Sequence, residues 1–206
     1  NYMTLTGKPP MMPEYGMGFW QCKLRYWNQE QLLSVARKYK ELGVPLDVIV
    51  VDFFHWTKQG EFKFDPKYWP DPKAMTDELH AMGVKLMVSM WPTINEKSEN
   101  YRHMIENNML IRTVSGSNRV FEFYGPQAEI DATNPETRKY VWKRLKENYI
   151  DNGVDCLWFD EAEPEIHPEH FDNLIFSIGN GSEVALLFPY YYAQLVHDGM
   201  REMGRD

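Results

Sequence analysis

An apolar run that ends in a cluster of carboxylates is the part of this sequence best suited to chemistry. The run extends from Cys156 to Phe159, and Asp160, Glu161 and Glu163 follow it. Strands of a parallel β/α protein are buried on both faces and read as continuous apolar runs, and their reactive groups lie at their carboxyl ends. Asp160 is therefore a candidate catalytic carboxylate. A cap for the helix or turn that follows is the alternative role for such a residue.

Three helical patterns end in Gly-Val, and an apolar strand follows each of them. Glycine just past a helix adopts the left-handed conformation without steric cost, and a short link into a strand is typical of parallel sheets. The three strands span residues 46–52, 85–91 and 155–160. Each strand ends in a functional-looking residue: Asp52, Trp91 and Asp160.

Caps and apolar spacing predict the remaining elements. We expect helices over residues 28–42, 71–82, 96–108, 134–149 and 190–203, a first strand over 17–23, and a hairpin of 110–114 and 120–123 around Ser115–Asn118. These elements make about four strand-helix units plus a hairpin. An eight-unit barrel typically needs ~250 residues, so the periodicity leaves open a small open α/β sheet or half of a barrel.

Composition narrows the class of protein. The net charge of -8 disfavours nucleic acid as a partner. The sequence contains no stretch of ~18 apolar residues, which a membrane-spanning helix would need. Cys22 and Cys156 lie in apolar runs and are expected to be buried free thiols. The aromatic content of 15% favours a sugar ligand. Because the chain starts at Asn1 without a signal-peptide pattern, we expect it to be part of a longer polypeptide.

Six motifs together resemble the catalytic domain of glycoside hydrolase family 31, the α-glucosidase and α-xylosidase family. Their order and separation, rather than any one motif, make the resemblance specific, and they cover nearly all 206 residues. The motifs are Leu5–Pro10, Gly18–Gln21, Val51–Trp56, Phe64–Pro66 with Trp69–Pro72, Val88–Pro92 and Trp158–Glu163. Within the family, the second and third motifs, with Phe19-Trp20-Gln21 and Phe54-His55-Trp56, look most like the bacterial α-xylosidase branch.

The resemblance implies a fold and a set of partners. The family domain is a (β/α)8 TIM barrel, so residues 1–206 would form a single partial catalytic domain with about the first four β/α units and an inserted hairpin. The rest of the barrel and the flanking β-domains would be missing from this chain. An oligosaccharide substrate is expected, and no cofactor. The compartment is not determined by the sequence; bacterial cytoplasm or periplasm fits the resemblance.

The resemblance also assigns roles to single residues. Asp160 matches the nucleophile, and Glu163 matches a glutamate that orients neighbours or binds a sugar hydroxyl. Asp52 matches an aspartate that hydrogen-bonds the sugar in the first subsite, since a carboxylate accepts two adjacent hydroxyl donors. Trp91 and Trp158 match aromatic positions beside the sugar. Phe54, His55, Phe19 and Arg25 are further pocket candidates, with His55 expected to be a structural hydrogen-bonding group.

The acidic stretch after Asp160 also contains histidines, and this composition suggests a metal site. Its prolines break any helical register between the two histidines, and no fixed ligand spacing is present. We therefore expect a solvated loop and no metal. The residues concerned are Glu161, Glu163, Glu165, His167, Glu169 and His170.

The second carboxyl group that retaining glycosidases need has no match here. In the family it lies after the nucleophile in the second half of the barrel, and neither Asp172 nor Glu183 fits its motif. We expect residues 1–206 alone to lack general acid catalysis, a step worth typically 10²–10⁴-fold. The open half barrel would also favour association into homo-oligomers, or poor folding. An α-glucan lyase, a transglycosylase and a non-catalytic carbohydrate-binding remnant are alternative functions.

Overall fold

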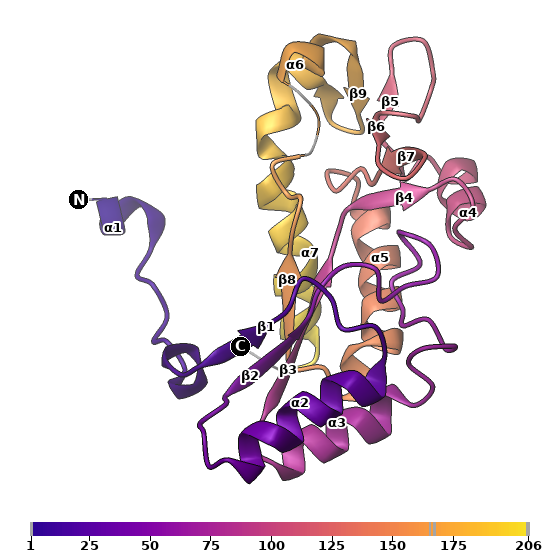
Figure 1. Cartoon of the computed structure of the whole chain (residues 1–206). Helices are drawn as coiled ribbons and strands as arrows, with labels where there is room; N and C mark the ends of the chain where they lie inside the picture. The colour runs from indigo at the N-terminus through magenta and orange to yellow at the C-terminus, as the bar shows by residue number, and fades with distance from the viewer. Residues whose placement is uncertain (1, 165, 167, 205–206) are drawn as a thin grey trace.

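A four-stranded parallel sheet forms the centre of the computed structural model, which describes residues 2–164, 166 and 168–204. Its strands are β1 (Trp20–Cys22), β2 (Val48–Val51), β3 (Lys85–Met90) and β8 (Cys156–Phe159). They lie in the order β1-β2-β3-β8 (Figure 1). Each pair is parallel and in sequential order, which is the arrangement of consecutive strands in a β/α barrel.

Helices α2 (Gln29–Glu41), α3 (Pro72–Ala81) and α5 (Pro135–Asn148) connect these strands, and α7 (Phe188–Glu202) follows β8. Three start where the sequence predicts. The side chains of Asn28, Asp71 and Asn134 each accept a hydrogen bond from a backbone N–H of the first helical turn, which satisfies donors that the helix itself leaves unpaired. Figure 1 shows α2 beside α3, and α7 runs along α5.

The core lies between the helices and the outer face of the sheet. Ile49, Leu86 and Val88 are fully buried there, together with Leu32 and Leu79 of the helices. Burying each such side chain contributes about 1.5–3 kcal/mol relative to exposure. Alternate residues of the same strands point to the opposite, inner face.

Two small antiparallel sheets lie beyond the carboxyl ends of the parallel strands (Figure 1). One contains β4 (Thr93–Asn95), β7 (Pro126–Glu129) and β6 (Phe121–Glu122), and the other contains β10 (Gly179–Asn180), β9 (Leu174–Phe176) and β5 (Arg112–Thr113). The short helices are α1 (Tyr2–Thr6), α4 (Tyr101–Glu106) and α6 (Gly181–Val184), with 3-10 turns at Glu14–Met17, Ile150–Asn152, Pro168–Asn173 and Ala185–Leu187.

The predicted hairpin of residues 110–114 and 120–123 is wrong. Strand β5 pairs with β9, while β6 pairs with β7. The turn that closes a hairpin lies instead between β6 and β7, where Tyr124 and Gly125 both have positive φ. The β5–β9 pairing joins segments about sixty residues apart, so no local pattern announces it.

The helix predicted over residues 96–108 is also too long, because only Tyr101–Glu106 is helical. The chain before it forms a turn, in which Ser98 N–H donates to the carbonyl oxygen of Asn95. Strand β4 precedes that turn and pairs with β7. Tertiary pairing of β4 therefore delays the start of the helix.

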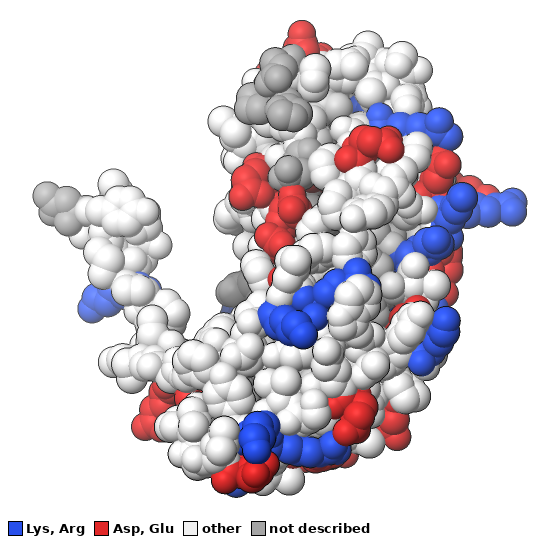
Figure 2. All heavy atoms as spheres, in the orientation of Figure 1, with Lys and Arg blue, Asp and Glu red and all other residues white. Residues whose placement is uncertain are grey.

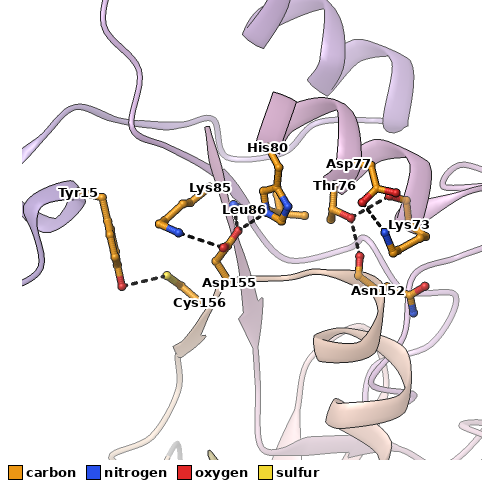
Figure 3. Close-up of polar contacts among 10 residues, drawn as sticks. All are labelled: Tyr15, Lys73, Thr76, Asp77, His80, Lys85, Leu86, Asn152, Asp155 and Cys156. Atoms are coloured by element: carbon orange, nitrogen blue, oxygen red, sulfur yellow. Dashed lines mark hydrogen bonds and ion pairs between the residues drawn. The ribbon is translucent and has the colours of Figure 1, made fainter. Parts of the chain in front are cut away.

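A network of polar contacts joins the amino ends of β3 and β8 to α3 (Figure 3). The Asp155 carboxylate accepts hydrogen bonds from Leu86 N–H at 2.9 Å, His80 Nε2 at 2.8 Å and Lys85 Nζ at 3.2 Å. Burial opposes ionisation of Asp155, but these three bonds outweigh it and hold its pKa below the usual value. The network fixes the end of the sheet opposite to the strand ends that carry Asp52 and Asp160.

The two cysteines are free, as expected, but the prediction that they are buried is wrong for both: Cys22 is exposed and Cys156 is half-buried. Both lie at the same level of the sheet, through the register Cys22–Val50–Met87–Cys156. No further element covers Cys22 within the described part of the chain, which leaves the inner face open there.

The surface is mixed in charge. Figure 2 shows acidic and basic side chains side by side on the face in view, while the N-terminal segment that carries α1 is mostly uncharged. In the described part of the chain, no helix has the length and apolar character needed to cross a membrane.

Candidate active site

Three residues predicted to lie at strand ends do so. Asp52 follows β2, Trp91 follows β3 and Asp160 follows β8. The backbone N–H of Asp160 still donates to the carbonyl oxygen of Met90 at 3.1 Å, so the ladder between β3 and β8 extends to this residue. Asp52 and Trp91 are buried. The strand order places the three on neighbouring strands at one edge of the sheet.

Asp52 is a buried carboxylate whose charge is partly stabilised. Its Oδ1 accepts a hydrogen bond from Phe53 N–H at 2.7 Å, and the thiol of Cys22 lies 4.0 Å from its Oδ2. Burial raises the pKa of Asp52, the Phe53 N–H partly offsets this, and the negative charge of Asp160 raises it further. The two carboxylates are thus close enough to repel each other.

His55 supports the end of β2 from inside the protein. Its Nδ1 lies 2.9 Å from the carbonyl oxygen of Asp52, and its Nε2 lies 2.8 Å from the hydroxyl of Tyr149. Burial lowers the pKa of His55 to about 4, although the contact with Asp52 opposes the shift. The ring is therefore neutral at neutral pH and acts as a structural hydrogen-bonding group, as predicted.

The other predicted site residues differ in exposure. Trp158 is 37% exposed and lines an apolar groove on the inner face of the sheet, together with Trp20, Cys22 and Val50. Phe54 is half-buried, and Glu163 is exposed. Alternation along β8 places Trp158 and Asp160 on the same side of the sheet.

Left-handed backbone conformations occur around these residues. In the described part of the chain, five non-glycine residues have positive φ, among them Phe54 at 64°, Tyr124 at 51° and Glu161 at 56°. Phe54 lies two residues after Asp52, and Glu161 directly follows Asp160. Such conformations cost about 1–3 kcal/mol each for bulky residues and cluster at functional sites.

Sequence reasoning missed the aromatic cluster above the strand ends. The Phe53 ring lies 5.4 Å from that of Trp91, and the Phe123 ring lies 4.9 Å from Trp91 and 5.8 Å from Phe54. Tyr124 contacts Phe54 edge-on at 5.2 Å. The only local signal was the aromatic-Gly-Pro stretch before β7, because the β4–β7 pairing that places it is long-range.

Tyr192 of α7 is a second residue that the sequence did not single out. It is buried, its ring lies 4.8 Å from that of Phe159, and its hydroxyl donates to the carbonyl oxygen of Met90 at 3.4 Å. Burial raises its pKa well above the usual value, and the charges of Glu129 and Asp160 add to this. Tyr192 thereby supports the end of β3 with a neutral hydroxyl and the end of β8 with its ring.

No metal site is evident among the residues whose positions are described, since no three histidine, cysteine or carboxylate side chains gather there in a metal-binding arrangement. Glu165 and His167 lie outside the described residues. The chemically active groups that the structure does bring together are two carboxylates and a wall of aromatic rings. Such a combination is suited to a polyhydroxylated ligand, with acceptors for hydroxyls and apolar faces for the ring.

A parallel β/α sheet with carboxylates at its strand ends is compatible with a TIM-barrel enzyme and also with an open α/β sheet. The model of the glycosyl hydrolases family 31 TIM-barrel domain matches residues 9–206. The chain belongs to glycoside hydrolase family 31 and forms the first part of its TIM-barrel domain.

Relatives of this chain include glucosidases and xylosidases. The uncharacterized family 31 glucosidase ORF2 of Pseudescherichia vulneris is 44% identical over the whole of this chain and 39% of its own length. An α-xylosidase of Saccharolobus solfataricus is 34% identical over 98% of this chain and 27% of its own length.

A solved structure is similar throughout. It is the crystal structure of a family 31 α-xylosidase from a soil metagenome, complexed with xylose. The two sequences are 49% identical and the structures superpose with a TM-score of 0.91. The match covers 95% of this chain and 29% of the xylosidase chain. The chain therefore spans between about a quarter and two fifths of the length of these relatives.

Proposed function

We propose that this barrel segment belongs to a retaining α-glycosidase that releases terminal α-linked xylose or glucose from oligosaccharides. The observation that carries the proposal is the position of Asp160 at the end of β8, next to Asp52 and the aromatic wall. Membership of family 31 supports it, as do the α-xylosidases among the relatives.

Asp160 is the nucleophile in this proposal. Its carboxylate oxygen attacks the anomeric carbon, a covalent glycosyl-enzyme forms, and the bond to the leaving oxygen breaks. A second carboxyl group must protonate that oxygen and later activate water. We expect this group beyond residue 206, because neither Asp172 nor Glu183 fits the motif.

The terminal sugar is bound by four residues in this proposal: Asp52, Trp91, Trp158 and Phe54. Glu163 orients neighbouring side chains or binds a hydroxyl group of the sugar. A buried carboxylate such as Asp52 accepts two adjacent hydroxyl donors, while the indole faces cover the ring. Phe54 follows Asp52 closely, and its left-handed backbone aims its ring at the same region as Phe53 and Phe123.

The experiment is mechanism-based labelling with 5-fluoro-α-xylosyl and 5-fluoro-α-glucosyl fluoride, followed by peptide mapping. The Asp160 carboxylate displaces fluoride at the anomeric carbon, so the C1–F bond breaks as a glycosyl ester to Asp160 forms. Fluoride leaves with little need for a general acid, and the fluorine at C5 stays on the sugar. We expect the label on the peptide that contains Asp160 in the complete polypeptide, and the faster reagent identifies the preferred sugar.

Two variants make the labelling specific. Asp160→Asn removes the attacking carboxylate and should abolish labelling, whereas Asp172→Asn changes an exposed carboxylate outside the motif and should leave it intact. Absence of label at Asp160 in the complete polypeptide would reject the retaining mechanism and favour a carbohydrate-binding role.

A further inference from the structure

Two exposed aromatic side chains lie near the aromatic wall described above: Tyr124 contacts its rings directly, and Trp27 is connected to it through Arg25. Tyr124 is 82% exposed and Trp27 is 58% exposed. Burying large aromatic rings is strongly favourable, so exposed ones beside a candidate site mark a contact surface. Neither residue has a role in the proposed binding of the terminal sugar.

Tyr124 continues the line of rings outward from the strand ends. Its ring lies 4.9 Å from that of Phe123, which in turn lies 4.9 Å from Trp91. The contact of Tyr124 with Phe54 ties it to the end of β2 as well. A continuous series of rings thus leads from a buried indole beside Asp160 to an exposed phenol.

The hairpin β6–β7 holds Tyr124 in this position. Its loop is braced by Gln127, whose Nε2 donates to the carbonyl oxygen of Phe123 at 2.7 Å. Strand β7 also pairs with β4, which begins two residues after Trp91. Figure 1 shows β6 and β7 beyond the carboxyl end of β3. The hairpin therefore extends the site rather than an unrelated surface.

Arg25 also contacts Phe54. Its guanidinium carbon lies 3.7 Å from the Trp27 ring centroid and 5.1 Å from that of Phe54. Among the described residues it has no hydrogen-bond or ion-pair partner, so its donors are available to a ligand. A guanidinium stacked on an indole is held in a fixed plane and presents those donors sideways.

We propose that Tyr124, Trp27 and Arg25 form the subsite for the leaving-group sugar, which follows the terminal residue in an oligosaccharide. This inference rests on the proposed function, since it takes the terminal sugar to lie at Asp52 and Asp160. The tyrosine and tryptophan rings stack on the apolar faces of the second sugar. The Arg25 guanidinium donates hydrogen bonds to its hydroxyls.

The test compares two substrates of the complete polypeptide that share a terminal sugar. A glycosyl fluoride has no second sugar, whereas the corresponding disaccharide has one. For Tyr124→Ala we expect the ratio of kcat/KM on disaccharide to kcat/KM on fluoride to fall about 3- to 10-fold, the range for loss of one aromatic contact. Arg25→Met, which keeps apolar bulk but removes the donors, should lower the same ratio.

Tyr190→Ala is the matched control, because Tyr190 is another exposed tyrosine in edge-on contact with an aromatic neighbour, on α7. It should leave the ratio unchanged. Equal losses on both substrates, or no loss on either, would overturn the second subsite. Failure of the wild type on the fluoride would instead count against the proposed glycosidase.

Isothermal titration calorimetry tests the second subsite by measuring sugar binding in the absence of catalysis. In an Asp160→Ala background, disaccharide binding should weaken when Tyr124→Ala is added, while binding of the monosaccharide should not. Equal weakening of both would show that Tyr124 supports the fold rather than the second sugar.

Discussion

Burial sets the ionisation of the titratable groups around the end of β2. The ring of His55 is buried and makes hydrogen-bond contacts at both nitrogens. Burial of the Asp52 carboxylate raises its pKa. A buried neutral imidazole can position the backbone of Asp52 without adding a charge near Asp160. His55 thus adds no charge of its own beside the carboxylates of Asp52 and Asp160.

His55 gives a pH prediction. The pKa of His55 is about 4 in the folded protein against a usual 6.5. Between these two pH values, His55 is protonated in the unfolded chain and neutral in the folded protein. Stability contributed by neutral His55 is present above about pH 6.5 and falls as pH drops towards 4. The loss is on the order of 3 kcal/mol.

The measurement is the free energy of urea unfolding between pH 7 and pH 4. His55→Gln should flatten the fall relative to wild type. His103→Gln, which removes an exposed histidine on α4, should not. Parallel curves for wild type and His55→Gln would contradict the assignment.

At the scale of elements, the amino ends of β3 and β8 are tied together by one carboxylate. Asp155 precedes β8, yet it accepts a bond from the backbone of Leu86 in β3 and another from His80 of α3. Its side chain is only 18% exposed. A single residue therefore connects two strands and a helix at the end opposite to the proposed site.

Asp155→Asn should lower the free energy of unfolding by about 1–3 kcal/mol at pH 7, because bonds to a charged acceptor are lost. The folded pKa lies below 3.8, so this contribution is present above about that pH. It is lost as pH falls through the folded pKa, and the gap between variant and wild type should close there.

Asp77→Asn is the control for this variant. It breaks the exposed i,i+4 pair with Lys73 on α3, a pair drawn in the same close-up (Figure 3). Exposed pairs of this kind contribute about 0.3–0.5 kcal/mol. Thermal unfolding followed by circular dichroism compares the stability of the two variants. Equal losses of stability would show that Asp155 does not connect β3, β8 and α3 as described.

At the scale of the whole molecule, the inner face of the sheet is open. An apolar groove there is lined by Trp20, Val50, Met87, Leu157 and Trp158 among others. Strands β1 and β8 form the two edges of this sheet in the described part of the chain. Open edges and exposed apolar faces favour association with another chain.

We therefore expect a polypeptide of residues 1–206 alone to self-associate through the inner face. Sedimentation velocity should detect dimers or larger species at micromolar concentration, and Met87→Lys should reduce them by placing a charge in the groove. Leu42→Lys, at an exposed leucine beside α2, should leave them unchanged. A monomer across the concentration range would refute association through this face.

Local physics determined most of the fold. Caps at Asn28, Asp71 and Asn134, repeated Gly-Val helix ends and apolar strand runs are signals within a few residues of each other. They placed the four parallel strands, the main helices and the strand-end positions of Asp52, Trp91 and Asp160. The choice of a barrel over an open sheet came from the family resemblance, because four β/α units are compatible with both.

Tertiary structure decided what depends on distant segments. The pairing of β5 with β9 and of β4 with β7 joins stretches whose separate patterns specify no partner, so the predicted hairpin was wrong. The β4–β7 pairing, together with the β6–β7 hairpin, carries Phe123 and Tyr124 to the strand ends. Burial determines the neutral state of His55, because desolvation depends on every neighbour and not on sequence spacing.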